Sequence, residues 1–244
     1  MRANAPERPR LRPRRHPGGA ERPSPDPGPR RGGRTPLARA HTAGAPLADI
    51  GVEVQATVAG AASLRLDWID WRGAPAVTFT RPPFAGSAWR RAWINAVDQW
   101  DDGRPEAFWL TQNAGRGLLI QGAEEWRDYE VQAVITPSLC AAAGIAARVG
   151  GLRRFYALLL RAGGRIVLLR ALEADAPLAE APFAWRQRQS YALRLAVEGP
   201  WLRAFVDDAP IFAVRDPGAP LRGGAAALVV EDGHMRCAAV GVGR

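Results

Sequence analysis

Short apolar runs separated by turn residues constrain the fold of this chain more than any other feature of its sequence. From about residue 50 to the end, such runs recur at roughly 8–12-residue spacing and are separated by Gly, Pro and Asp. The clearest run is the one in which Tyr191, Leu193, Leu195 and Val197 alternate with other residues. A period of two is typical of a half-buried strand, and many such runs at regular spacing are typical of a sandwich or barrel. The sequence therefore predicts an all-β fold, an antiparallel β-sandwich.

The same pattern predicts strands along the rest of the chain and turns between them. Gly163 and Gly164 are a strong signal for a hairpin between two of these strands. Hairpin turns are also expected at 113–117, 207–208 and 232–233, where Gly, Asn or Asp residues gather. The further expected strands are 52–58, 63–71, 77–80, 108–112, 118–121, 129–135, 145–149, 155–161, 166–172, 201–206, 211–214, 225–230 and 235–242.

One aromatic segment fits two kinds of secondary structure. Trp89, Trp93, Val97 and Trp100 fall at helical spacing, which is the pattern of a helix with one buried face. A twisted strand fits the segment 88–100 nearly as well, and we favour it slightly.

Residues 1–45 have the composition of a disordered tail. They are rich in Pro, Arg and Gly and contain almost no aliphatic residues, so they cannot bury enough apolar surface to offset the entropy of ordering. Residues 1–40 hold 11 Arg and 3 acidic residues, and so carry +8 of the net charge of +9. Because the rest of the chain is nearly neutral, the sequence predicts no nucleic-acid binding except through the tail.

Two β regions are expected after the tail. The first is an N-terminal β segment at 46–105, which could belong to a first β unit, and the second is a sandwich domain at 106–244. A short internal repeat agrees with this division, because Glu53-Val-Gln-Ala56 recurs as Glu130-Val-Gln-Ala133.

The sequence carries no signal for a membrane or for export. No apolar stretch approaches the roughly 20 residues needed to span a membrane, and the N-terminus lacks the apolar core of a signal peptide. We therefore expect a cytoplasmic protein with no membrane partner. Cys140 and Cys237 could form a disulfide, but two unlinked thiols in a reducing compartment are favoured.

The sequence favours a binding module over an enzyme. A glycoside hydrolase needs two carboxylates facing one cleft, whereas the three-residue spacing of Asp67 and Asp70 puts them on opposite faces of a strand. His16 and His41 lie in the tail, and His234 lies beside a turn. The chain has no phosphate-binding glycine loop and no His/Cys cluster, so we expect neither a cofactor nor a metal.

Several strings between Gly115 and the end of the sequence carry a resemblance to a known superfamily. They are G-R-G-L-L-I-Q-G (115–122), W-R-D-Y-E-V-Q-A (126–133), A-G-I-A-A-R-V (143–149), R-R-F-Y-A-L-L-L (153–160), L-R-L-A-V-E-G-P-W-L-R-A-F-V-D-D (193–208) and L-R-G-G-A-A-A-L (221–228). Through these strings the chain resembles the concanavalin A-like superfamily and its laminin G-like members. This resemblance implies a jelly-roll sandwich.

The span 50–244 also resembles the C-terminal β region of bacterial proteins of the ADP-ribosylglycohydrolase family. The strings that carry this second resemblance are W-I-N-A-V-D-Q-W (93–100), W-R-D-Y (126–129) and G-L-R-R-F-Y-A-L (151–158). The catalytic unit of that family is a helical domain with clustered acidic metal ligands, and residues 1–45 cannot form one. The resemblance therefore implies an accessory module, with a hydrolase domain as its candidate partner.

Aromatic and arginine side chains are the candidate binding residues. Aromatic faces pack against the apolar face of a sugar ring, and guanidinium groups bind hydroxyls or, bidentately, phosphate. The alternative is that the aromatic rings fill the core and that the arginines pair with Glu173, Asp175 and Glu180 on a solvated face. The candidates are Trp71, Trp126, Arg148, Arg153, Tyr156 and Arg170.

The sequence thus predicts a non-catalytic β-sandwich module that binds a carbohydrate or an ADP-ribose-like ligand, or that packs against a hydrolase partner. Two alternatives stay open. One is a glycoside or ADP-ribosyl hydrolase whose catalytic acids are not recognisable in the sequence. The other is a structural or partner-docking domain.

Overall fold

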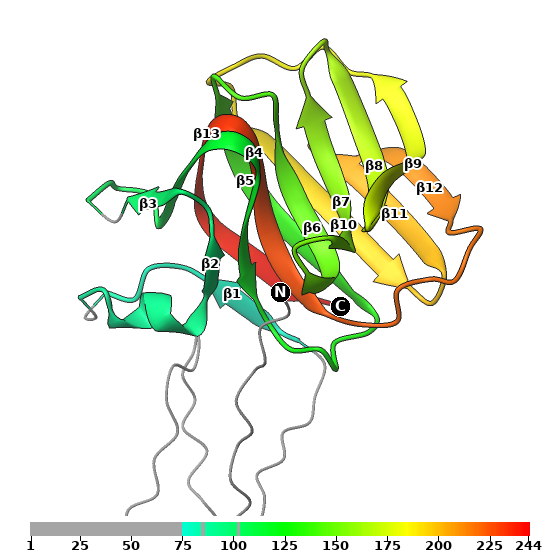
Figure 1. Cartoon of the computed structure of the whole chain (residues 1–244), viewed down its shortest axis with the longest axis horizontal. Helices are drawn as coiled ribbons and strands as arrows, with labels where there is room; N and C mark the ends of the chain where they lie inside the picture. The colour runs from blue at the N-terminus through cyan, green and yellow to red at the C-terminus, as the bar shows by residue number, and fades with distance from the viewer. Residues whose placement is uncertain (1–74, 84–85, 102) are drawn as a thin grey trace, which may run out of the picture. The chain divides into compact units, whose positions relative to one another are not determined.

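The computed structural model describes residues 75–83, 86–101 and 103–244, which fold almost entirely into antiparallel strands (Figure 1). The predicted antiparallel β-sandwich is therefore confirmed. The expected strands at 52–58 and 63–71, and with them Trp71, lie outside the described residues. The elements are β1 (Val77–Phe79), the 3-10 helix η1 (Ala88–Ala92), β2 (Ile94–Ala96), β3 (Gln99–Asp101), β4 (Phe108–Gln121), β5 (Tyr129–Ser138), β6 (Ala142–Gly151), β7 (Arg154–Arg161), β8 (Arg165–Leu172), β9 (Ala174–Pro182), β10 (Tyr191–Glu198), β11 (Trp201–Val206), β12 (Ala209–Arg215) and β13 (Ala225–Gly243).

Two long strands, β4 and β13, run through both layers of the sandwich. The first half of β13, up to Glu231, pairs with β6, whereas the second half, from His234, pairs with β5. β4 pairs with the opposite edge of β13 along both of these halves. One layer therefore has the order β12-β11-β10-β5-β13, and the other continues as β13-β6-β7-β8-β9. β1 pairs with the end of β13, while β2 and β3 pair with β4.

The side chains between the two layers form the main core. Leu193 and Leu195 of β10 point into it from one layer, as the alternation of that strand predicts. Leu158 and Leu160 of β7 point into it from the other layer. Burial of such apolar surface, at about 25 cal/mol per Å², is the main stabilising contribution of a sandwich of this kind.

The layer of β6, β7 and β8 is apolar on both faces. Phe155, Leu159, Val167 and Leu169 point away from the main core, yet each has 0% exposure and belongs to a second apolar cluster. A strand that is buried on both faces has a near-continuous apolar sequence rather than an alternating one, as in this layer. A polar binding surface is therefore to be sought at the ends of the strands or on the other layer.

The structure corrects two of the expected hairpins. Residues 113–117 are not a turn, because β4 continues through them, and 232–233 likewise lie within β13. The two strands bend together at a β-bulge, where Asp232 Oδ1 accepts a hydrogen bond of 2.6 Å from the Gly115 N–H. Gly and Asp at a bulge give the same local sequence signal as Gly and Asp in a hairpin turn, so the two were not distinguishable in the sequence.

The aromatic segment is neither one continuous helix nor a single twisted strand, so the slight preference for a strand was wrong in part. It forms η1 and then the two short strands β2 and β3. Trp89, Trp93, Val97 and Trp100 are all buried in the main core, and the Trp93 ring centroid lies 4.9 Å from that of Phe108. Only Trp89 lies in η1, so the helical spacing of the four residues reflects their burial and not one continuous helix.

Two expected hairpins are confirmed, and one strand was not expected. The turn at Gly163 and Gly164 joins β7 to β8 with both residues at positive φ, and the turn at Asp207 and Asp208 joins β11 to β12. β9 had no alternating apolar signal, because it is an edge strand that, among the described strands, pairs only with β8, and it contains Pro177.

The domain boundary expected between residues 105 and 106 stays a prediction, although β1 to β3 pair with β4 and β13 in the same sheet.

Cys140 and Cys237 are both buried and unlinked. Burial raises the pKa of the Cys140 thiol to about 11 and that of Cys237 to about 12. None of the helices among the described residues has the length and apolarity to cross a membrane.

Candidate functional site

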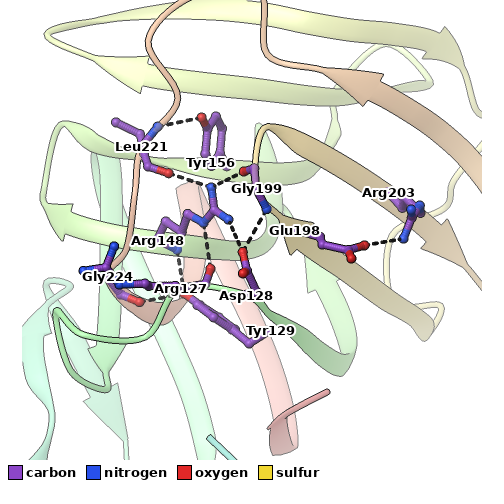
Figure 2. Close-up of polar contacts among 10 residues, drawn as sticks. All are labelled: Arg127, Asp128, Tyr129, Arg148, Tyr156, Glu198, Gly199, Arg203, Leu221 and Gly224. Atoms are coloured by element: carbon purple, nitrogen blue, oxygen red, sulfur yellow. Dashed lines mark hydrogen bonds and ion pairs between the residues drawn. The ribbon is translucent and has the colours of Figure 1, made fainter. Parts of the chain in front are cut away.

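Four connections come together at one end of the sandwich, which we call the loop end. They are 122–128 between β4 and β5, 152–153 between β6 and β7, 199–200 between β10 and β11, and 216–224 between β12 and β13. The side chain of Arg148, near the end of β6, contacts three of these connections (Figure 2). The loop end is also where most of the sequence-predicted binding residues lie.

Arg148 is buried, with 3% exposure, and its guanidinium is almost completely hydrogen-bonded. Its Nε donates to the carbonyl of Arg127 at 2.8 Å. Its Nη1 donates to the carbonyls of Gly199 at 2.7 Å and Leu221 at 2.6 Å. Its Nη2 lies 3.0 Å from Asp128 Oδ1, which forms an ion pair. A buried charge that is satisfied in this way holds the surrounding loops in one arrangement.

The backbone of Arg148 is held as firmly as its side chain. Its φ of 50° lies in the left-handed region, within a bulge of β6, and its N–H donates to Tyr129 Oη at 2.6 Å. The Tyr129 hydroxyl in turn lies 2.8 Å from the carbonyl oxygen of Gly224, and burial raises the pKa of this phenol well above its usual range. A Cβ at Gly224, whose φ is +140°, would lie 2.5 Å from the Arg148 carbonyl carbon, so only glycine permits this approach.

Asp216 is the second buried charge of the loop end, with a fully buried side chain. Its Oδ2 accepts a hydrogen bond of 2.6 Å from Tyr156 Oη, and its Oδ1 accepts from Arg170 Nη1 at 2.8 Å and from the Gly218 N–H at 3.0 Å. Burial acts to raise the pKa of Asp216, but these hydrogen bonds outweigh it and lower the pKa, so the carboxyl is ionised at neutral pH. Tyr156 Oη also accepts from the Leu221 N–H at 2.9 Å.

Two adjoining hollows open above this buried network. Asp128, Arg148 and Asp216 contribute to the floor of the first, which has a volume of about 410 Å³, and the second measures about 690 Å³. Around them stand four exposed arginines that form no ion pair with a carboxylate among the described residues. These arginines are Arg127 and Arg222, which line both hollows, Arg215, which lines the first, and Arg154, which lines the second.

The structure places the sequence-predicted residues at different depths of the loop end. Arg148 and Tyr156 lie beneath the surface. Arg170 is partly exposed and ion-paired to Asp216, although its buried Nε has no hydrogen-bond partner among the described residues. Arg153 is exposed in the β6–β7 turn, and Trp126 is half-buried before β5. The sixth residue, Trp71, lies outside the described residues.

Two of the three carboxylates suggested as alternative partners for these arginines pair elsewhere. Asp175 accepts from both Nη atoms of Arg116, at 2.9 and 2.6 Å. Glu180 accepts from Arg165 at 2.8 Å. Asp175 and Glu180 therefore pair with Arg116 and Arg165, and not with the predicted binding residues.

Four residues of the loop end were missed by sequence reasoning: Arg127, Arg215, Asp216 and Arg222. Asp216 stands before Pro217 and Gly218, which is a common turn sequence and gives no sign of a buried carboxylate. Arg127 lies in the connection between β4 and β5, whereas Arg215 ends β12 and Arg222 lies in the connection that follows it; only the folding of the chain brings Arg127 to the same hollow as the other two.

Comparison with known proteins identifies the fold but not a family. No family model matches the chain, and no curated protein matches it. The carbohydrate-binding module CBM66 from Bacillus subtilis superimposes with a TM-score of 0.57 at 17% identity, over 63% of this chain and 96% of that module. A Bacillus subtilis protein of unknown function with a galectin-like fold superimposes with a TM-score of 0.51 at 11% identity, over 70% of this chain and 96% of the other. The chain therefore has the β-sandwich fold that these two proteins share, which agrees with the concanavalin A-like architecture expected from the sequence.

Proposed function

We propose that this chain is a non-catalytic carbohydrate-binding module whose binding site is the loop end. The observation that carries the proposal is the group of exposed guanidinium groups of Arg127, Arg215 and Arg222 around a hollow of about 410 Å³. A guanidinium presents five N–H donors in a fixed fork, which suits adjacent hydroxyl groups and carboxylates alike. The likeness in fold to a carbohydrate-binding module over 96% of its length supports this ligand class.

The buried network beneath the hollow supports the same proposal. Arg148 and Asp216 fix the connections that carry the exposed arginines, so little loop order remains to be gained when a ligand binds. Arg148 and Tyr156 would then act as positioning residues. Arg153 would lie at the rim, and the half-buried ring of Trp126 would offer an apolar surface.

A finer proposal concerns the identity of the ligand and of the partner. An ADP-ribose-like ligand carries a pyrophosphate, which arginine binds bidentately, and a ribose with adjacent hydroxyls. The resemblance to the C-terminal region of ADP-ribosylglycohydrolase-family proteins supports this ligand, with a hydrolase domain as partner.

A second candidate function, a hydrolase, would need two carboxylates at one hollow. Asp128 and Asp216 line the first hollow, and Glu124 and Glu125, which are adjacent in the sequence and exposed, line the second. The contacts of Asp216 count against it. The lowered pKa of Asp216 excludes it as the general acid, which needs a raised pKa. Its side chain is also fully buried and both its oxygens accept hydrogen bonds, so neither oxygen is available as a nucleophile or base. We therefore favour binding over hydrolysis.

Calorimetric titration of the full chain with ADP-ribose and with neutral and acidic oligosaccharides tests the proposal. We expect saturable heat with one of these classes. Arg222→Ala and Arg127→Ala should each weaken that binding about tenfold or more, because a hydrogen bond to a charged group contributes about 1.5–3 kcal/mol. Both side chains are exposed, so their loss should leave the fold intact.

Arg165→Ala is the control, because Arg165 is a half-buried arginine of β8 that does not line either hollow. Its binding heat should equal that of the unmodified protein. Saturable heat with ADP-ribose alone would support the finer proposal. The absence of heat with every ligand would overturn the binding proposal and leave the structural or partner-docking role.

A further inference from the structure

A polar surface lies on the outward face of the layer that contains β5 and the second half of β13. Strand register places side chains of neighbouring strands in rows across the sheet. One row consists of Asp101, Trp109, Arg236 and Thr136 on β3, β4, β13 and β5. The next row on the same face consists of Gln99, Thr111, His234 and Ser138.

The row of residues between these two rows points into the core, which shows that the two polar rows share the outward face. Trp100, Leu110 and Met235 form the intervening row and are buried in the main core. The two outward rows contain one aromatic residue and no aliphatic residue. The outward face of the opposite layer, by contrast, is apolar. We call the eight residues of the two rows the polar face.

The polar face contains a hollow of about 180 Å³. Hydrogen bonds orient several of the side chains that line this hollow. His234 Nδ1 lies 2.9 Å from Thr111 Oγ1, and Nε2 has no hydrogen-bond partner among the described residues. Thr136 Oγ1 lies 2.8 Å from Ser190 Oγ. The lining side chains are those of Trp109, Thr136, Ser138, Arg188, His234 and Arg236.

Two arginines bring further N–H donors to this hollow. Arg236 donates to Glu106 at 3.0 Å, and its guanidinium lies 5.9 Å from the centroid of the Trp109 ring. Arg188 belongs to the connection between β9 and β10, where its N–H donates to the Pro137 carbonyl at 2.7 Å. The exposed guanidinium of Arg188 has no hydrogen-bond partner among the described residues.

We propose that the hollow in the polar face is a second ligand site, separate from the loop end, that takes a single sugar ring. An indole beside fixed donors and hydroxyl groups matches a ring with an apolar face and several hydroxyls, each of which both donates and accepts. The volume is below the roughly 300–1,000 Å³ of pockets for drug-sized ligands, so the site suits one ring and not an oligosaccharide.

The ligand class of this site rests on the proposed carbohydrate-binding function, but its location does not depend on the loop end. The test is nuclear magnetic resonance of the full chain with single sugars: glucose, galactose, mannose, fructose and glucuronate. We expect at least one of them to give saturable shifts, and the indole N–H signal of Trp109 should be among those that move. The Trp109→Phe variant identifies that signal by its loss.

Arg236→Ala and Arg165→Ala form a matched pair. Both side chains are 42% exposed and each is ion-paired to one glutamate, but only Arg236 lines the polar-face hollow. We expect Arg236→Ala to weaken binding of the single sugar at least tenfold and Arg165→Ala to leave it unchanged. Arg188→Asn should weaken it similarly, because asparagine tolerates the φ of 62° while the guanidinium is lost.

The outcomes separate the two sites. Loss of single-sugar binding in Arg236→Ala and Arg188→Asn, with no effect of Arg222→Ala, supports the polar-face site. Single-sugar binding that responds to Arg222→Ala and not to the polar-face variants overturns the second site and leaves the loop-end proposal standing. If no single sugar binds while an oligosaccharide still binds at the loop end, the second site is again overturned. If only the polar-face variants affect any saccharide, the loop-end proposal fails instead.

Discussion

At the scale of single residues, the loop end depends on a few buried polar groups. Arg148 joins carbonyls of three separate connections, and Asp216 joins Tyr156, Arg170 and a backbone N–H. A charge out of contact with water is costly unless it is hydrogen-bonded, so each of these groups strongly favours the one arrangement of loops that satisfies it.

Arg148→Met should reduce the free energy of unfolding by about 3–5 kcal/mol, because it removes a buried cation and leaves three carbonyls, among them the buried one of Leu221, without their donor. Urea denaturation measures the change. Arg203→Met is the control, since Arg203 and Glu198 form an exposed pair, with 51% and 68% of their side chains accessible. Its loss should cost about 0–1 kcal/mol. An equal effect of the two substitutions would contradict the role assigned to Arg148.

At the scale of elements, the bend shared by β4 and β13 decides how the two layers connect. Each strand pairs in one layer before the bend and in the other after it. The bend requires a close approach between β13 and the end of β5. A Cβ on Gly233, whose φ is +157°, would lie 2.0 Å from the Leu139 carbonyl oxygen and 2.4 Å from the Cys140 Cα.

Gly233→Ala should therefore lower the free energy of unfolding by at least about 2 kcal/mol, through backbone strain and the forced displacement of Leu139. Gly243→Ala is the matched control in the same strand, because a Cβ there would have no atom within 4 Å. We expect the midpoint of urea unfolding to fall for Gly233→Ala, and the free energy of unfolding of Gly243→Ala to stay within about 0.5 kcal/mol of that of the unmodified protein. Similar midpoints for the two variants would show that the bend adjusts without cost.

At the scale of the whole molecule, the continuity of β13 predicts that both layers unfold together. Leu228 of β13 has 0% exposure and lies in the core between the layers. Leu228→Ala should cost about 2–5 kcal/mol. Hydrogen exchange should show the same loss of protection in β7, in one layer, as in β10, in the other.

Val134→Ala provides the comparison, because Val134 is 55% exposed on β5 and its truncation should change stability by less than about 0.5 kcal/mol. If Leu228→Ala opened β7 and left β10 protected, the two layers would be separate folding units.

The sequence by itself determined those features that depend on local geometry. Alternation along 191–197 identified β10 and its inward residues, since successive side chains of a strand point to opposite faces. The pairs Gly163–Gly164 and Asp207–Asp208 identified hairpin turns, because their positive φ favours these residue types. The fold class followed from the number and spacing of such signals.

The tertiary structure alone decided which residues are buried and which share a surface. Arg148 has the sequence properties of an exposed binding residue, and only its contacts with Gly199 and Leu221 place it beneath the surface. Trp109 and Arg236 are distant in the sequence and become neighbours through the register of β4 and β13. Contacts of this kind depend on how the strands pair and pack, and a local pattern of residues carries no record of that pairing.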